Sequence, residues 1–290
     1  MAFLAASDIN NPWVMLRSWT WDPLVVAGVG LGLWWYLRAV ARLRPARWPG
    51  WRSRCFVAGN VVLILALLSP VDVYAELLLS VHMVQHLLLT MVAPPLLLLG
   101  APLTLAIRTV RPSDREILLR FLHGRVVGFL SQPLLGWGLF VAVLWASHLP
   151  AFYDATIRST PLHAGEHLVY LVTALMLWRP MVASDPAPSR LSHPARLLCL
   201  FLLMPQMTFL GLAIYGSNTP IYAPYVATSV LFGTTAVADQ HLAGAIMWAS
   251  GMLFMVPAMA VVLVDWMRTD EREAARSDAR LDRAEAVRNG

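Results

Sequence analysis

The chain has 290 residues, of which 58% are hydrophobic and 13% are charged. A soluble domain carries about 25% charged residues, so this composition excludes an ordinary soluble globular protein. The formal net charge is +5, and the two cysteines, Cys55 and Cys199, form no C-x-x-C motif, so neither a disulfide framework nor thiol-based metal exchange is expected.

Long apolar runs predict an all-α polytopic membrane helical bundle. Several runs approach or exceed the ~20 residues that span a bilayer. Lipid cannot hydrogen-bond to an exposed backbone, and a β-barrel needs alternating segments of about ten residues in place of continuous apolar runs. We expect about seven transmembrane helices, at residues 23–41, 55–70, 74–100, 133–149, 161–179, 196–215 and 239–265.

Local signals mark where several of these helices begin or bend. Asp72 and Asp239 are placed to cap the third and seventh predicted helices, and Thr160-Pro161 predicts an N-cap followed by proline at the first helical position. Pro94-Pro95 is expected to kink or break the third helix. Residues 108–125 are expected to form an amphipathic stretch at the membrane interface.

The distribution of arginine predicts the orientation in the membrane. Every basic residue is arginine, and only Arg17 and Arg158 lie on one of the two sides. Cytoplasmic loops carry an excess of basic residues, so we expect the N-terminus outside and the C-terminus in the cytoplasm. The arginines expected in the cytoplasm are Arg38, Arg42, Arg44, Arg47, Arg52, Arg54, Arg108, Arg111, Arg115, Arg120, Arg125, Arg179, Arg190, Arg196, Arg268, Arg272, Arg276, Arg280, Arg283 and Arg288.

This topology divides the chain into three parts. Residues 1–22 form an outer N-terminal segment, residues 23–265 the seven-helix transmembrane domain, and residues 266–290 a charged cytoplasmic tail that is a short helix or disordered. No signal peptide is expected, because the first twenty residues lack a basic n-region and a cleavage site. The positive net charge reflects the arginine asymmetry across the membrane, and no nucleic-acid partner is expected.

Two histidine pairs stand out inside these apolar helices. His82 and His86 occur in the run HMVQH, and His163 and His167 in the run HAGEH. Residues four apart lie on one face of a helix, about 6 Å apart at Cβ, so each pair can chelate one metal ion. Two such helices supply four nitrogen ligands, which suits copper or zinc. We therefore predict a metal site formed by the two pairs near the outer surface.

Other polar residues fall on the same side of the membrane. Ionisable groups at membrane depth are costly and usually mark function. Glu166 lies about 60° around its helix from the adjacent histidines and could flank the metal or support a ligand. Asp239 is better explained as a helix cap. The further candidate ligands are His148, His241, Glu166, Asp154 and Asp239.

The remaining histidines and the methionines are interpreted more simply. His123 and His193 lie in cytoplasmic loops and are given no role in the site. The methionines in the spans are assigned to the core, but any that lies on the histidine face would favour Cu(I), because thioethers are soft ligands. These methionines are Met83, Met91, Met204, Met207 and Met247.

Three segments carry a resemblance to a known family. The runs HMVQHLLLTMVAPPLLLLGAP, HLPAFYDATIRSTPLHAGEHLVYLVTALMLWRP and DQHLAGAIMW together resemble the CtaG-type cytochrome c oxidase assembly factors, over residues 20–265. The two histidine pairs match the family pattern, and His148, Asp154 and Asp239 fall in matching motifs. His241 is at a position where glutamine is expected in some members.

The resemblance implies a process and a set of partners. It implies a multi-pass protein of the bacterial cell membrane that is needed to assemble active haem–copper oxidases, with copper delivery as the proposed role. It also implies that the protein is an assembly factor and not an enzyme. The implied partners are oxidase subunits, the lipid bilayer and a copper donor outside the cytoplasm. Copper is the expected metal, with zinc as the alternative.

Two other functions remain open at this stage. HAGEH fits the H-x-x-E-H pattern of zinc metalloproteases, which predicts an intramembrane zinc-dependent hydrolase if Asp239 supplies the third ligand. The later glutamates, all in the tail, lie on the wrong side of the membrane for this role. A bis-His haem protein is the second alternative, although it leaves the spacing within each histidine pair unexplained.

Overall fold

The computed structural model describes residues 12–43, 48–185 and 191–289, and no strand occurs among them. Residues 1–11, Arg44, Arg47, Arg190 and Gly290, which enter the predictions above, lie outside the described residues. The helices are α1 Pro12–Arg17, α2 Pro23–Arg42, α3 Gly50–Leu67, α4 Pro70–Ala75, α5 Leu79–Leu87, the π-helix η2 Leu88–Val92, α6 Ala93–Leu99, α7 Pro102–Thr109, α8 Pro112–Leu122, α9 Arg125–Leu130, α10 Pro133–Ser147, α11 Pro150–Arg158, α12 Thr160–Val182, α13 His193–Tyr215, α14 Tyr225–Thr228, the 3-10 helix η3 Ser229–Phe232 and α15 Ala236–Asn289.

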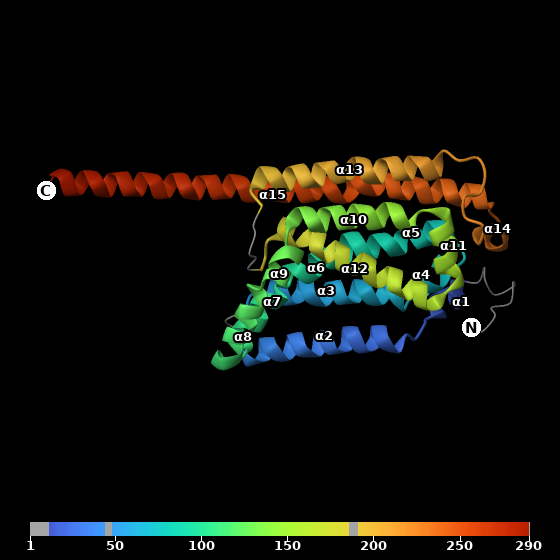
Figure 1. Ribbon diagram of the computed structural model, residues 1–290, viewed down its shortest axis with the longest axis horizontal. Helices are drawn as coiled ribbons and strands as arrows, with labels where there is room; N and C mark the ends of the chain where they lie inside the picture. Colours follow the sequence, from blue (N-terminus) through green and yellow to red (C-terminus); the bar gives the residue numbers. More distant parts are fainter. Residues whose placement is uncertain (1–11, 44–47, 186–190, 290) are drawn as a thin grey trace.

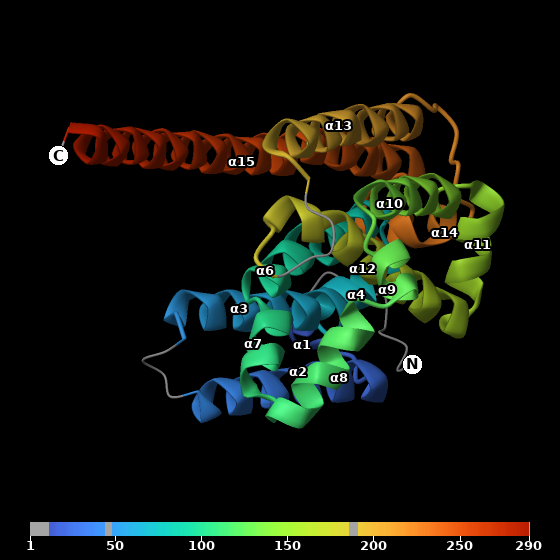
Figure 2. The same ribbon diagram turned by 60° about the vertical axis from the view of Figure 1, so that its left-hand side comes forward.

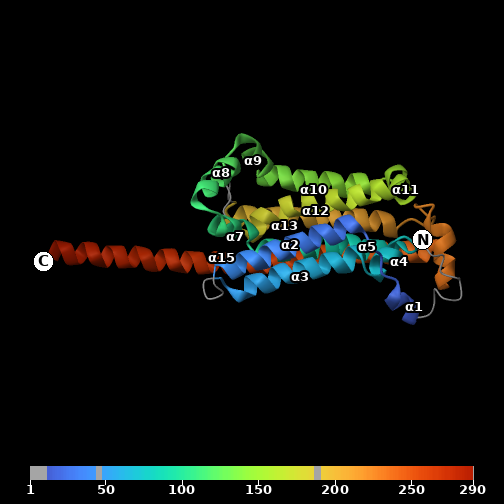
Figure 3. The same ribbon diagram turned by 90° about the horizontal axis from the view of Figure 1, so that it is seen from below.

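The long helices run side by side as a bundle (Figure 1). The chain through α5, η2 and α6 lies inside the bundle, where α5 packs against α15 and α6 packs against α3 and α12. Figure 2 shows α13 and α15 together on one side of the bundle, and α2 and α3 together on the opposite side. Figure 3 shows α10 beside α12. The predicted all-α membrane bundle is confirmed.

Two glycines allow α13 and α15 to approach closely. A Cβ atom on Gly244 would lie 2.7 Å from the carbonyl oxygen of Gly211 and 2.6 Å from the backbone nitrogen of Tyr215. Real Cβ atoms do not come so close to backbone, so only glycine fits at Gly244. Small residues at helix crossings are typical of membrane bundles, because they let backbones meet.

The structure does not confirm the predicted count of seven membrane spans. Within the described residues, five helical stretches are long and apolar enough to cross a membrane, or six if α10 and α11, which meet at 79°, form one span. The five are Pro23–Arg42, Gly50–Leu67, Leu79–Thr109, His193–Tyr215 and Ala236–Arg283. Helix α12 is long enough but is not in this set, since its histidines, Glu166 and Arg179 make it less apolar.

The third predicted helix, 74–100, is in fact several elements. Helix α4 is separate, and Ser69 caps it by accepting a hydrogen bond from the backbone N–H of Val71 at 3.1 Å. The prediction that Asp72 is a helix cap is wrong, because its carboxylate accepts hydrogen bonds from Thr20 Oγ1 at 3.0 Å and from Gln85 Nε2 at 2.9 Å. Asp72 therefore links the segment before α2 to α5.

The proline pair does not break the helix but follows a change in its winding. The π-helix η2 ends at Val92, and the chain continues as α6 from Ala93, the residue before Pro94. Pro94 has no N–H for the carbonyl of Thr90, four residues earlier. The indole N–H of Trp178 on α12 donates to that carbonyl at 2.8 Å. A neighbouring helix thus satisfies the group that proline leaves free.

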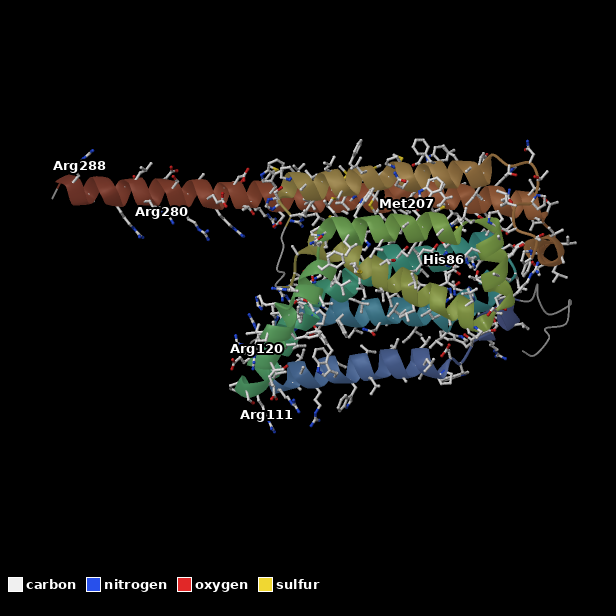
Figure 4. The ribbon with its side chains drawn as sticks, viewed as in Figure 1. His86, Arg111, Arg120, Met207, Arg280 and Arg288 are labelled. Carbon is white, nitrogen blue, oxygen red and sulfur yellow. The ribbon has the colours of Figure 1, made fainter. Side chains whose placement is uncertain are left out.

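The ends of the bundle differ in composition. Helices α4, α11 and α14 lie at the end where the N-terminus is marked, and α8 and α9 lie at the other end (Figure 1). Helix α8 belongs to the predicted interfacial stretch 108–125 and has no buried residue. Arg120 on this helix and Arg111, directly before it, lie at this end (Figure 4). We call the second end the arginine end, because the predicted cytoplasmic arginines that are described flank its loops and the tail.

The charged tail is a continuation of the last helix. Helix α15 runs for 54 residues and projects far beyond the arginine end (Figure 1). At 1.5 Å per residue its length is about 80 Å. The sequence predicts a short helix or disordered chain for residues 266–290, whereas α15 continues past residue 265 without a break. The start of α12 also differs slightly, since Ser159 takes the N-cap position predicted for Thr160.

Candidate metal centre

Five histidine side chains, which we call the histidine cluster, gather inside the bundle toward the end opposite the arginine end. They are His82 and His86 of α5, His148 directly after α10, and His163 and His167 of α12. The ring centroids are 4.1 Å apart within the α5 pair and 4.3 Å apart within the α12 pair. Across the two helices, His82 and His163 are 5.8 Å apart, and His86 and His167 are 5.9 Å apart.

His148 extends the cluster toward α10. Its ring centroid is 6.4 Å from that of His86. Its Nδ1 lies 2.7 Å from the carbonyl oxygen of Leu144, so this nitrogen carries the proton and Nε2 is left with a free lone pair. The structure therefore brings together the two predicted pairs and one of the further candidates.

The cluster is buried, and many of its nitrogens have no partner. His82 is 0% exposed and His86 is 6% exposed. Both ring nitrogens of these two residues have no hydrogen-bond partner, and the same holds for Nε2 of His148, His163 and His167. Buried polar atoms are nearly always satisfied, so seven unsatisfied nitrogens in one place require an explanation. Imidazole nitrogens with free lone pairs are ligands for copper and zinc.

The side chains do not form a closed metal site as they stand. Among the described residues, no group of three or more His, Cys, Asp or Glu side chains could hold a metal ion. The rings of His82 and His163 are stacked, with an angle of 18° between their planes. The cluster gathers residues of the type that ligates metals, but their side chains do not converge on one point.

Asp239 fixes the helix that carries the first histidine pair. It lies in the first turn of α15, which begins at Ala236, so it is not the N-cap that the sequence predicted. Its carboxylate accepts hydrogen bonds from the backbone N–H of Leu79 at 2.6 Å and from Ser80 Oγ at 2.5 Å. Asp239 therefore caps α5 from a different helix, and its oxygens are occupied.

Two acidic residues adjoin the cluster. Glu166 is 5% exposed, and neither of its carboxylate oxygens has a hydrogen-bond partner. It lines an open cavity of about 300 Å³ between α10, α11 and α12. Asp154 on α11 reaches the mostly exposed Arg158 at 4.0 Å, a weak pair, and its Oδ1 is buried without a partner.

His241 does not join the cluster. Its Nε2 lies 3.2 Å from the carbonyl oxygen of Ser217, and its ring packs on Tyr215 with centroids 5.1 Å apart. The remaining histidines lie at the arginine end, as expected. His123 is exposed, and His193 reaches the carboxylate of Asp265 at 3.2 Å.

Four tyrosines around the cluster were missed by the sequence analysis. Tyr153 lies 5.1 Å from His82 and Tyr170 lies 4.5 Å from His86, as ring centroids. Tyr222 and Tyr225 come from the segment between α13 and α15, and burial raises the pKa of both phenols, so both remain donors at neutral pH. Tyr225 donates to the carbonyl of Ala75 at 2.9 Å.

One of these tyrosines had a sequence signal. Tyr170 follows His167 by three residues and therefore shares the face of α12 that carries the pair. Its hydroxyl bonds to Ser147, the residue before His148. Tyr222 donates to the carbonyl of His148 at 3.0 Å, a contact that no local spacing indicates.

Together the bundle and the cluster define a polytopic membrane protein with five histidine side chains enclosed among its helices. The family model for the cytochrome c oxidase caa3 assembly factor (Caa3_CtaG) matches residues 34–269, which include the whole histidine cluster. The chain therefore belongs to this family, and the resemblance found in the sequence is confirmed.

Mycobacterial proteins are similar to this chain over most of its length. An uncharacterized protein of Mycobacterium bovis and one of Mycobacterium tuberculosis are each 32% identical over 278 residues, which cover 92% of this chain and 42% of each relative. An uncharacterized protein of Mycobacterium leprae is 32% identical over 275 residues, or 91% of this chain and 42% of the relative. The chain thus spans less than half the length of these relatives. No solved structure matches it.

Proposed function

We propose that this assembly factor binds copper at the histidine cluster and passes it to a subunit of the oxidase whose assembly it serves. The observation that carries the proposal is the set of buried imidazole nitrogens without partners on α5, α12 and at the end of α10. Copper is the cargo of this process, so the site has to release the ion as well as bind it.

The geometry supports binding that is easily reversed. Each helix presents two rings on one face, and the rings already lie within 6 Å of their counterparts across the helices. Small rotations about the side-chain bonds can therefore convert ring-to-ring packing into coordination. Glu166 is buried beside the cluster, and an ionised carboxylate at this place favours a cation nearby.

The direction of delivery follows from the arginines. The positive-inside rule puts the arginine end in the cytoplasm and the histidine cluster in the outer half of a bacterial cell membrane. A copper donor and the oxidase subunit then meet the protein from outside. Reporter fusions are expected to place residues 155 and 225 outside and residues 115 and 280 in the cytoplasm. A cytoplasmic reporter at residue 155 would put the cluster on the wrong side for this route.

Copper content and oxidase activity, measured in the same cells, test the proposal. His82→Ala and His167→Ala are each expected to remove most of the bound copper and most of the oxidase activity. The double variant is expected to lose little more, because ligands of one site are strongly coupled. Additive losses would indicate two separate sites, and full copper content in the double variant would contradict the proposal.

The same purified protein separates the alternatives. Excess copper is expected to restore oxidase activity in a single variant if the role is delivery. Bound zinc with unchanged oxidase activity in both histidine variants would favour the zinc-dependent hydrolase. A haem absorbance spectrum that disappears in His82→Ala would favour the bis-His haem protein.

A further inference from the structure

A small cavity beside the histidine cluster is lined by sulfur. Four thioethers reach it from four elements, and two rings of the cluster lie on its wall. The lining residues with donor atoms of interest are Met83 on α5, Met91 on η2, Met207 on α13, Met247 on α15, His86 and His148. Figure 4 shows His86 and Met207 in the half of the bundle away from the arginine end. The cavity therefore adjoins the cluster on the side of α13 and α15.

The size and burial of the cavity suit a single ion. Its volume is about 20 Å³. That is close to the space of one water-sized sphere. The four methionines are between 1% and 4% exposed, so their side chains lie away from bulk water. The rest of the wall is apolar or aromatic apart from Thr90, whose hydroxyl donates to the carbonyl of His86 at 2.6 Å.

Core filling alone does not account for this arrangement. Methionine often fills irregular gaps in cores because it is flexible. Here, however, the methionines surround a space that is left open, and its lining also includes His86 and His148, which carry buried ring nitrogens without partners. The π-helix that carries Met91 is a form frequent at functional sites. Sulfur and unpaired imidazole nitrogen around one cavity form a mixed set of soft ligands.

We propose that this cavity is a second copper site, selective for Cu(I), which receives the ion from the histidine cluster through His86 and His148. The inference rests on the proposed function, because copper has to enter the cluster first. Neutral thioethers select Cu(I), whereas Zn(II) and Cu(II) are better served by imidazole and carboxylate ligands. The shared rings let the ion exchange one ligand at a time.

The transfer needs no change of oxidation state. The ion keeps its charge while bonds to imidazole nitrogens of the outer rings break and bonds to thioether sulfurs form. No electron donor or acceptor is required, and no proton has to move. The site thus makes the protein a carrier of Cu(I) and not of Cu(II).

X-ray absorption at the copper edge tests the inference directly. The full-length protein in detergent is loaded with Cu(I) from a bicinchoninate complex, and Ag(I) serves as a redox-inert second probe. Sulfur scattering around copper is expected in the unchanged protein. In the triple variant Met83→Leu, Met207→Leu, Met247→Leu, which keeps only Met91 of the four thioethers, that scattering is expected to fall to one sulfur at most and Cu(I) affinity to fall about tenfold or more. Zn(II) binding is expected to stay unchanged.

Controls keep the two proposals separable. Met204 lies one turn from Met207 on the same helix but does not line the cavity. The variant Met204→Leu is therefore expected to keep the sulfur signal. Copper surrounded only by nitrogen in the unchanged protein would overturn the second site and leave the histidine cluster as the copper site. Absence of any bound copper would overturn the proposed function itself. The signal of the unchanged protein decides the matter even if the triple variant does not fold.

Discussion

The two ends of the bundle differ in how their polar groups are paired. At the arginine end several of these groups have partners: Asp185 accepts hydrogen bonds from Thr104, through its backbone N–H at 2.8 Å and its hydroxyl at 2.5 Å, and Arg196 reaches the mostly exposed Asp265 at 3.1 Å. In the histidine cluster, by contrast, ring nitrogens are buried without partners. The paired end stabilises helix ends, whereas the unpaired cluster keeps its lone pairs available for a ligand.

The histidine cluster can keep its nitrogens unpaired because the structure around it is held by hydrogen bonds. Unpaired buried nitrogens cost free energy, so the surrounding structure must hold them in place. Two hydrogen bonds just outside the cluster provide this support. The backbone N–H of Leu79 at the start of α5 donates to Asp239, and the indole N–H of Trp178 donates to the carbonyl of Thr90.

The largest effect is expected at Asp239. Asp239→Ala leaves the backbone N–H of Leu79 and the hydroxyl of Ser80 buried without an acceptor, at a cost of about 2–3 kcal/mol in the free energy of unfolding. Because His82 follows within one turn, copper binding is expected to weaken in parallel. Thermal unfolding in detergent and copper content measure the two effects.

A matched variant sharpens this test. Asp239→Asn keeps one acceptor oxygen and removes the charge, so it is expected to lose less stability than Asp239→Ala. Equal stability of Asp239→Ala and the unchanged protein would show that the start of α5 does not depend on α15.

Trp178→Phe is expected to have the next largest effect. It keeps an aromatic ring but leaves the carbonyl of Thr90 without a donor, which costs about 1–2 kcal/mol. Trp145→Phe is the control, because its indole N–H bonds to Gln206 at an exposed position. Similar losses of unfolding free energy in both variants would argue against a special role for the bond next to the π-helix.

At the arginine end a smaller effect is expected from Asp265→Asn. The carboxylate is 56% exposed, so solvent screens its pair with Arg196 and the loss is about 1 kcal/mol or less. Arg196 retains its hydrogen bond to the carbonyl of Met181. Copper content is expected to stay unchanged. A loss of copper without a loss of protein would mean that the two ends are coupled.

The smallest effect is expected at His123. Its side chain is exposed, and Nδ1 contacts only the carbonyl of Leu119 in its own helix at 2.7 Å. His123→Ala is expected to change the free energy of unfolding by no more than about 0.5 kcal/mol and to preserve copper content and oxidase activity. Loss of oxidase activity at a normal protein level would mean that histidines outside the cluster contribute to function.

Local patterns predicted much of this molecule. Apolar runs gave the long helices to within a few residues in most cases, and the four-residue spacing of His82 with His86 and of His163 with His167 indicated which faces meet. That the pairs bind copper stays a prediction. Spacing of this kind is visible because both members lie on one helix.

The misses share a physical cause. Asp239 lies 160 residues from Leu79 in sequence, and nothing local distinguishes a cap for its own helix from a cap for another. His241 lies near the start of α15, at the end of the bundle opposite the arginine end, but its ring faces the segment after α13. The thioethers of the cavity come from four elements, so only the packed bundle brings them together.

The unbroken winding of α15 has a consequence for its projecting part. Each added or deleted residue turns everything beyond it by about 100° and shifts it by 1.5 Å along the axis. An insertion after residue 270 therefore re-aims the charged tail without touching the bundle, and the insertion of seven residues nearly restores its direction at a greater distance. The direction in which the tail presents its side chains about the helix axis is therefore fixed relative to the turn that holds Asp239.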